Sequence, residues 1–154
     1  MKRFDLPYGR GTISLSLPER RVKAVLESHL HTYYPDQGEE ELVRRALEHP
    51  EGSPRLSRLA EGKHNVVIIA SDHTRPVPSR YIIPAMLREI REGNPEADIT
   101  ILIATGCHRA PTREELIQKF GEEIAEREKI VIHSCEDSED FVSLGTLPSG
   151  GELI

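Results

Sequence analysis

The stretch NVVIIASDHTRPVPSR, residues 65–80, constrains the fold of this chain more than any other. Residues 66–70 form an unbroken apolar run rich in β-branched side chains, which is typical of a strand buried on both faces of a parallel sheet. The polar block 71–75 follows, and Pro76 and Pro78 then exclude both ladder pairing and a helix interior. The block is therefore predicted to be a loop at the carboxyl end of a strand, where open α/β sheets bind ligands.

A second strand of the same kind is predicted at residues 99–104, ITILIA, and it also ends in a polar loop, 105–109. An amphipathic helix is expected between the two strands, from Ser79 or Arg80 to Glu92. A right-handed strand–helix–strand crossover makes the two strands parallel neighbours. Their polar loops should then lie side by side on one edge of the sheet.

The remaining patterns complete an α/β chain. A hairpin is predicted from the alternation in 12–17 and, more loosely, in 21–26. Further elements are expected as helices at 39–48, 54–61, 112–120 and 122–128 and as strands at 129–133 and 141–147. Together these elements predict a Rossmann-like sheet with mostly parallel strands, helices on both faces and an N-terminal β-hairpin.

The overall composition limits the classes of function. The chain has 154 residues, 30% of them charged, with a formal net charge of −6 and no basic cluster, which argues against a nucleic-acid partner. No apolar run approaches the roughly 18 residues of a membrane span, and no signal peptide follows Met1, so a cytoplasmic protein is expected. Cys107 and Cys135 are too few for a disulfide framework and are expected to stay reduced.

The two polar loops carry side chains that could do chemistry. Arg75 and Arg109 can each grip a carboxylate or phosphate with a planar guanidinium. His108 could abstract a hydroxyl proton at neutral pH and return it, and Gly106 would let a ligand approach the main chain. Simpler roles stay open: Asp72 could pair with Arg75 or cap loop amides, and His108 could be an ordinary hydrogen-bonded histidine. The spacing of the histidines and cysteines matches no common zinc site, so no metal ligand is predicted.

Two motifs in this order and spacing resemble the amino-terminal part of the nickel-dependent lactate racemase family. They are DHTRPVP at 72–78 and ATGCHR at 104–109, followed by the helix end at Gly121 and by Ser-Leu-Gly at 143–145. The resemblance runs from Thr12 to the end of the chain. It implies a nickel pincer nucleotide cofactor that accepts the C2 hydrogen of a 2-hydroxy acid as hydride while a histidine takes the hydroxyl proton.

Carried over by motif, the resemblance assigns roles to individual residues. His108 would be one of two general acid/base histidines, and Arg75 would orient the substrate and polarise its oxygen. Asp72 would lie beside the cofactor. Thr105 and Gly106 are expected to line the site on the cofactor side, and Arg109 on the substrate side.

Other functional groups of that family lie further along than this chain extends. They are the lysine that carries the cofactor covalently, the histidine that ligates nickel and the second catalytic histidine. Residues 1–154 are therefore expected to be a single α/β domain, the amino-terminal domain or a truncated form of a longer two-domain racemase. This part alone should be inactive, and the carboxyl-terminal part should complete the site for lactate or a related 2-hydroxy acid.

Two other functions remain open from the sequence. A free-standing α/β module could bind a nucleotide or sugar phosphate at the loop 71–75, close to a helix start. Alternatively, the polar edge of the sheet could be a docking face for a partner subunit.

Overall fold

The computed structural model describes residues 1–136 and 141–154, and its contacts divide the chain into two units. The units are Met1–Asp36 and Gln37–Ile154. The α/β body lies in the second unit, so the expected single domain over residues 1–154 stays a prediction.

The first unit contains the N-terminal hairpin, built from β1 (Lys2–Tyr8) and β2 (Gly11–Leu17). The predicted strand at 12–17 is correct, but its partner precedes it in the chain instead of following at 21–26. The two-residue connection explains the difference, because Gly9 takes a positive φ of 58° and closes the tight kind of turn that suits twisted antiparallel strands. After β2 the chain enters a short 3-10 helix, Glu19–Arg21, which ends the pairing.

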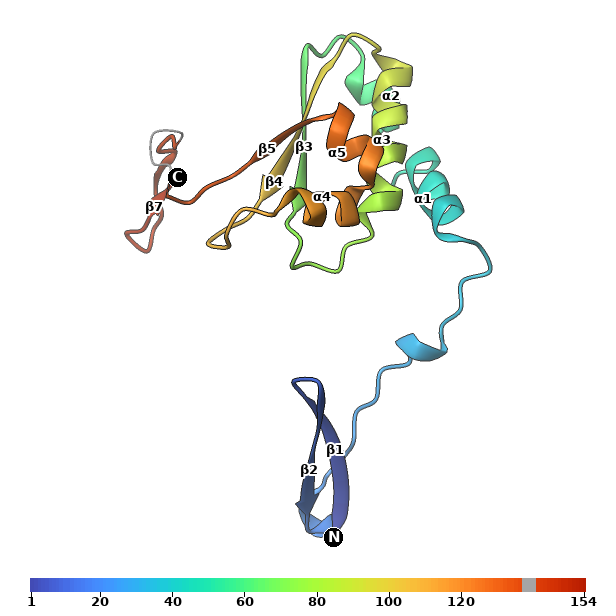
Figure 1. Cartoon of the computed structure of the whole chain (residues 1–154), viewed down its shortest axis with the longest axis vertical. Helices are drawn as coiled ribbons and strands as arrows, with labels where there is room; N and C mark the ends of the chain where they lie inside the picture. The colour runs from blue at the N-terminus through green and yellow to red at the C-terminus, as the bar shows by residue number, and fades with distance from the viewer. Residues whose placement is uncertain (137–140) are drawn as a thin grey trace. The chain divides into compact units, whose positions relative to one another are not determined.

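The second unit is organised around a three-stranded parallel sheet in the order β3-β4-β5 (Figure 1). Its strands are β3 (Asn65–Ser71), β4 (Asp98–Ala104) and β5 (Lys129–Ile132). Ser71 pairs with Ala104, so β3 and β4 end at the same level. The predicted parallel pairing is confirmed, and the two polar loops leave one edge of the sheet together.

In residues 37–136 and 141–154, five α-helices are found with this sheet. They are α1 (Glu39–Glu48), α2 (Leu56–Ala60), α3 (Ser79–Gly93), α4 (Arg113–Phe120) and α5 (Glu122–Arg127). Thr112 and Glu115 form the predicted capping box of α4, and α2 begins later than its proline suggested. A short antiparallel pair, β6 (Gly145–Thr146) and β7 (Glu152–Leu153), replaces the longer strand expected at 141–147. Among the described residues, no helix has both the length and the apolar composition of a membrane span.

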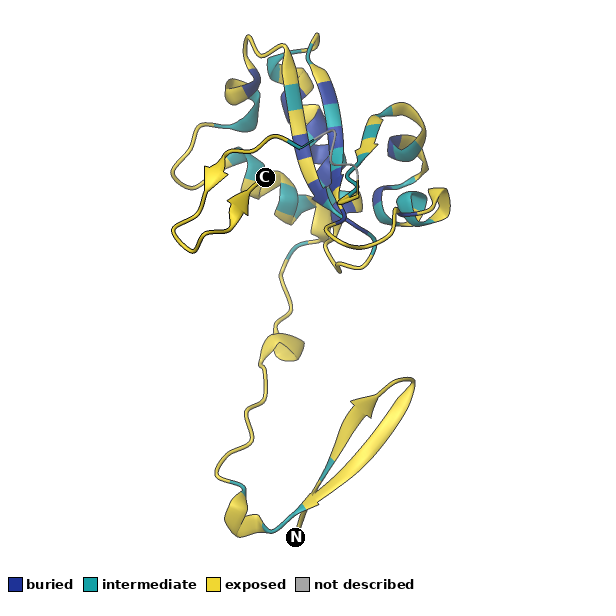
Figure 2. Ribbon diagram, turned by 90° about the vertical axis from the view of Figure 1, so that its left-hand side faces the viewer, coloured by how far each residue is buried: buried dark blue, intermediate teal, exposed yellow. Residues whose placement is uncertain are grey.

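The core lies on one face of the sheet. Ile68 and Ile101 point into it and are buried, whereas Val67 and Ile69 on the opposite face are 57% and 72% exposed (Figure 2). Because the strand order follows the chain, right-handed crossovers place every crossover helix on the same side. The α/β fold and the hairpin are confirmed, but in the described residues the helices expected on both faces cover only one.

The helical layer is closely packed against itself and the sheet. Phe120 and Ile90 are almost fully buried in the core. A side chain on Gly93 would collide with the main chain of Ser57, so α3 can approach the start of α2 only because residue 93 is a glycine. The side-chain amide of Asn94 (Nδ2) donates to the carbonyl of Ala60 and fixes the end of α2.

A matched pair of strand substitutions tests this one-sided core. We expect Ile101→Val to lower the free energy of unfolding by about 0.5–1.5 kcal/mol, because it removes a methylene from a side chain with no exposed surface. Ile69→Val removes the same group from a side chain that is 72% exposed and should cost less than about 0.5 kcal/mol. Urea denaturation of both variants measures the difference, and equal losses would contradict a core on one face.

Candidate functional site

The loop after β3 folds around a buried carboxylate. Asp72 is 2% exposed, and its Oδ1 accepts hydrogen bonds from the Thr74 amide at 3.0 Å and from the Thr74 hydroxyl at 2.7 Å. This Asx-type turn is a common use of aspartate at the end of a strand. It confirms the simpler expectation that Asp72 caps loop amides, and it leaves the second oxygen, Oδ2, free to meet the neighbouring loop.

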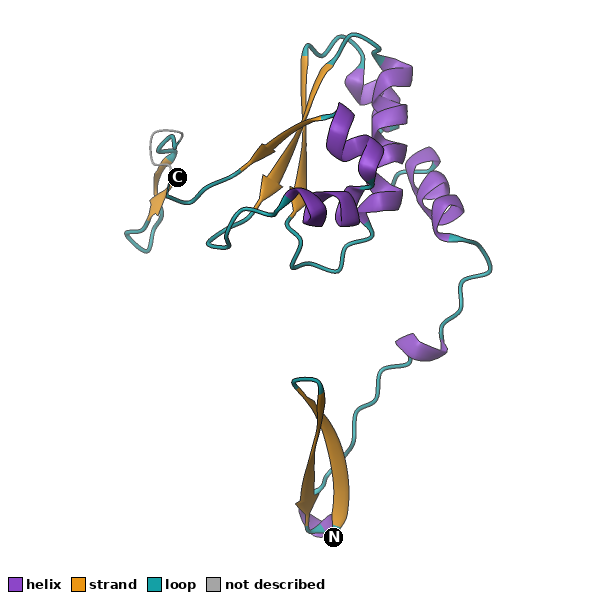
Figure 3. Ribbon diagram, viewed as in Figure 1, coloured by secondary structure: helices purple, strands orange, loops and turns teal. Residues whose placement is uncertain are grey.

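The loop after β4 brings an imidazole to that second oxygen. The amide of His108 donates to the carbonyl of Thr105 at 3.1 Å and closes a tight turn in which Gly106 has a φ of 58°. The His108 Nδ1 then lies 2.5 Å from Asp72 Oδ2. The two loops (teal in Figure 3) therefore meet through an Asp–His pair, whereas no ion pair joins Asp72 to Arg75 in the described residues.

The environment of Asp72 determines how His108 is oriented. The Thr74 hydroxyl and the His108 ring both lower the pKa of Asp72 below its ordinary range, against the opposing effect of burial. An ionised carboxylate only accepts hydrogen bonds, so Nδ1 must carry a proton. The other ring nitrogen, Nε2, is then the one free to exchange a proton with a ligand, and the side chain is 45% exposed.

A cavity of about 500 Å³ opens beside this pair. It is lined by the ends of β3 and β4 and by their loops, including Asp72, Arg75, Thr105, Gly106 and His108. No carboxylate among the described residues pairs with the Arg75 guanidinium. The amine of Lys119, on α4, donates to the carbonyl of Arg75 at 3.1 Å and holds the loop main chain. An anionic ligand in the cavity would thus meet a free guanidinium and an oriented imidazole.

Thr105 and Gly106 line the cavity in different ways. The Thr105 hydroxyl donates to the carbonyl of His133 at 2.7 Å and lies 3.1 Å from its Nδ1, so it ties the β4 loop to the segment after β5. At Gly106 no atom lies within 4 Å of the position that a Cβ would take. Gly106 is therefore required by its positive φ, and it leaves open space next to the main chain.

Arg109 is not brought to this cavity. Its guanidinium donates to both oxygens of Glu115 at 2.8 and 2.6 Å, and it lowers the pKa of Glu115 to about 2. Glu115 also lies 3.6 Å from the Nε2 of His73. The structure thus gathers five of the predicted residues around the cavity: Asp72, Arg75, Thr105, Gly106 and His108. The guanidinium of Arg109 instead binds Glu115, a residue of α4.

Sequence reasoning missed two supporting residues. Thr74 stands in the polar block without any sign of a special role, yet it supplies two of the hydrogen bonds to Asp72. Lys119 lies 44 residues from its partner Arg75, and burial lowers the pKa of its amine. The Asp-x-Thr spacing could have indicated the first contact, but nothing in the sequence signals the second.

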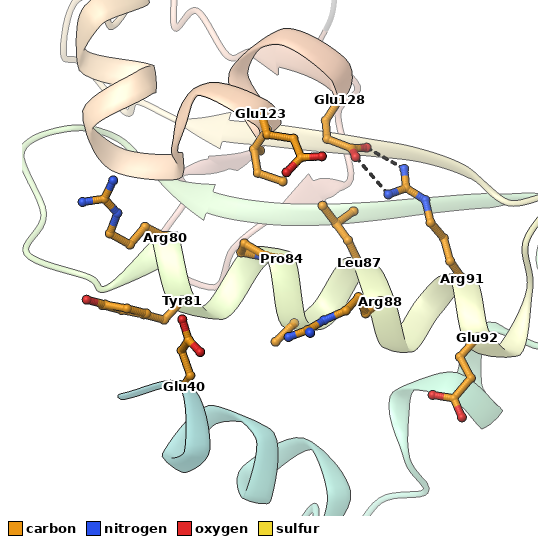
Figure 4. Close-up of a pocket in the computed structure, with 12 residues that line it drawn as sticks. Glu40, Arg80, Tyr81, Pro84, Leu87, Arg88, Arg91, Glu92, Glu123 and Glu128 are labelled. Carbon is orange, nitrogen blue, oxygen red and sulfur yellow. Dashed lines mark hydrogen bonds and ion pairs between the residues drawn. The ribbon is translucent and has the colours of Figure 1, made fainter. Parts of the chain in front are cut away.

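A larger groove of about 860 Å³ lies elsewhere, between α1, α3 and α5 (Figure 4). Its charged side chains include Arg91, which donates to both oxygens of Glu128 at 2.9 and 2.7 Å. Of the residues that the structure describes, no histidine, cysteine or aspartate lines the groove. Because it offers no group that titrates near neutral pH, we assign the candidate site to the smaller cavity.

Comparison with known proteins identifies the family. Residues 8–154 match the sequence model described as lactate racemase N-terminal domain. The chain is 49% identical over 153 residues to lactate racemase of Thermoanaerobacterium thermosaccharolyticum and 47% identical over 154 residues to that of Lactiplantibacillus plantarum. These alignments cover 99% and 100% of the chain but 36% of each relative. The chain thus spans about a third of the length of the curated relatives it matches.

The solved structures agree with the sequence comparison. The lactate racemase apoprotein from T. thermosaccharolyticum superposes with a TM-score of 0.81 at 48% identity, covering 98% of this chain and 34% of that one. A Thermotoga maritima protein superposes with a TM-score of 0.56 at 25% identity, covering 72% of this chain and 25% of that one. Because the family model matches nearly all of the sequence and the racemases are about half identical to it, this chain belongs to the lactate racemase N-terminal domain family.

Proposed function

We propose that this chain supplies the amino-terminal half of the active site of a nickel-pincer-dependent racemase or epimerase of lactate or a related 2-hydroxy acid. The observation that carries the proposal is the Asp72–His108 pair beside the Arg75 guanidinium, which pairs with no carboxylate in the part of the chain that the structure describes. Both relatives are lactate racemases, which supports the reaction class. We place the protein in the cytoplasm and infer that this part alone does not turn over substrate.

In this proposal His108 is the general base for one enantiomer. Its Nε2 takes the hydroxyl proton of the substrate as the C2 hydrogen leaves as hydride, and it returns the proton in the reverse direction. Asp72 accepts from Nδ1, which keeps Nε2 unprotonated and aimed away from the carboxylate. Asp72 also stabilises the imidazolium that forms, so that the proton transfer does not require a separate counter-ion.

Arg75 is proposed to hold the substrate. A planar guanidinium can bind the carboxylate of a 2-hydroxy acid with two hydrogen bonds or polarise its oxygen. The hydrogen bond from Lys119 to the main-chain carbonyl of Arg75 holds the backbone at this residue. The Arg75 side chain therefore extends into the cavity from a fixed position. As the hydroxyl proton leaves, negative charge develops on the substrate oxygen, and a fixed guanidinium beside it stabilises that charge.

The described residues fit one side of the cofactor site. The nickel pincer nucleotide, when bound, supplies the acceptor for the hydride. In the part of the chain that the structure describes, no group of three or more His, Cys, Asp or Glu side chains could hold a metal ion. As the resemblance to the racemases implies, we propose that the nickel ligand and the covalent lysine come from the remainder of the longer protein. The open space at Gly106 suits close approach of the cofactor, with Asp72 and Thr105 beside it.

Replacing the imidazole tests the general base. We expect His108→Gln in the longer, cofactor-loaded protein to lower kcat for lactate racemisation by at least about 100-fold, because Gln can donate a hydrogen bond but cannot exchange a proton at neutral pH. Chiral chromatography of the lactate enantiomers measures turnover, and circular dichroism checks that the fold is kept. Turnover within about threefold of the wild type would remove His108 from the mechanism.

The acid sensitivity of the pair gives a second test. Because the folded protein lowers the pKa of Asp72 below 3.8, its ionised form stabilises the fold above that pH, and this contribution is lost as the pH falls through the folded pKa. We expect Asp72→Asn to be less stable than wild type at about pH 6, and the gap should shrink on going to about pH 3. Urea denaturation at both pH values measures the gap, and a constant gap would contradict an ionised Asp72.

The two arginines give a matched comparison. Arg75→Lys keeps the positive charge but removes the planar guanidinium that can bind a carboxylate through two hydrogen bonds. We therefore expect the KM for lactate to rise by about tenfold. Arg109→Lys makes the same change at a side chain whose guanidinium binds Glu115. The KM of this variant should stay within about twofold of the wild-type value. Steady-state kinetics of both variants decide the matter: an equal or larger effect at Arg109 would exchange their proposed roles.

A further inference from the structure

The two cysteines of this chain come to the same edge of the sheet. Cys107 lies in the turn after β4 and Cys135 in the turn after β5, and the two strands are parallel neighbours. Both thiols are free and exposed. The mechanism proposed above uses neither of them.

Hydrogen bonds hold the two cysteine-bearing segments together. The amide of His133 donates to the carbonyl of Ile103 at 3.0 Å, and the hydroxyl of Thr105 donates to the carbonyl of His133 at 2.7 Å. Thr105 and His133 are hydrogen-bonded, and each cysteine lies two residues beyond its member of this pair. The two cysteines therefore lie in neighbouring turns, which is the arrangement that a disulfide requires.

Burial and the neighbouring Cys107 sulfur raise the pKa of the Cys135 thiol. A raised pKa leaves less of the reactive thiolate at Cys135. Cys107 lines the cavity beside the Asp72–His108 pair, so a small disulfide that enters the cavity meets this thiol first.

The location gives the pair a consequence for the site. Cys107 lines the 500 Å³ cavity and precedes His108 in the Thr105–His108 turn. A covalent link to the β5 segment would add a second tie to the one made by the Thr105 hydroxyl. It would therefore fix the turn that carries the imidazole.

We propose that Cys107 and Cys135 form a reversible intramolecular disulfide when the protein meets a small disulfide such as oxidised glutathione. The Cys107 thiolate attacks one glutathione sulfur, which forms a mixed disulfide and releases one glutathione thiolate. The Cys135 thiolate then attacks the Cys107 sulfur and releases the second. The protein loses two electrons and two protons, and the oxidant becomes two molecules of reduced glutathione. This modification site does not depend on the proposed racemase activity.

Peptide mapping of the full protein after treatment with oxidised glutathione tests the proposal. After alkylation of unreacted thiols, the main product should be a cross-linked pair of peptides that contain Cys107 and Cys135. Dithiothreitol should restore both free thiols. In Cys135→Ser the first attack cannot be resolved, so the mixed disulfide of Cys107 with glutathione should accumulate at least about tenfold above its wild-type level.

The matched variants make the outcome decisive. Cys107→Ser leaves Cys135 alone and should give only its slower mixed disulfide, and circular dichroism of each Ser variant checks that the fold is kept. The proposal is overturned if the wild type carries glutathione on both cysteines at the levels seen in the single variants. It is equally overturned if the cross-links join different molecules, which would appear as dimers on non-reducing electrophoresis.

Discussion

The parallel pairing of β3 with β4 is the constraint on which the candidate site depends. Ser71 and Ala104 are register partners, so the next residues on the two strands, Asp72 and Thr105, emerge at the same level. Asp72 and His108, which are 36 positions apart in the sequence, therefore meet although each lies close to the end of its own strand. A slip of one residue would turn the buried side of a strand outward, and the same apolar faces that build the core prevent it.

The burial of Asp72 shows how this geometry becomes chemistry. A carboxylate with almost no exposed surface would normally prefer its neutral form. Here a hydroxyl, an amide and an imidazole all donate to it, and the balance favours the charged state. The loop sequence Asp-His-Thr supplies two of those donors locally, so only the imidazole has to come from the neighbouring strand.

The sequence predicted this part of the molecule well because strong local patterns agree with the tertiary structure. Unbroken β-branched runs identified β3 and β4, and sudden polar blocks identified their loops. The pairing of the hairpin was harder, since alternation in 21–26 competed with a glycine turn whose geometry is not visible in composition. The uncovered sheet face could have been anticipated from a strand order that follows the chain. The engagement of Arg109 by Glu115 depends on side-chain geometry, which no spacing rule provides.

The contact between Lys119 and the carbonyl of Arg75 has a consequence for substitutions outside the cavity. It joins residues 44 positions apart, on α4 and on the loop after β3. The residues that line the cavity include Arg75 but not Lys119. A change on α4 that breaks this contact would therefore loosen the main chain that carries the Arg75 guanidinium, although the altered residue touches no ligand in the cavity.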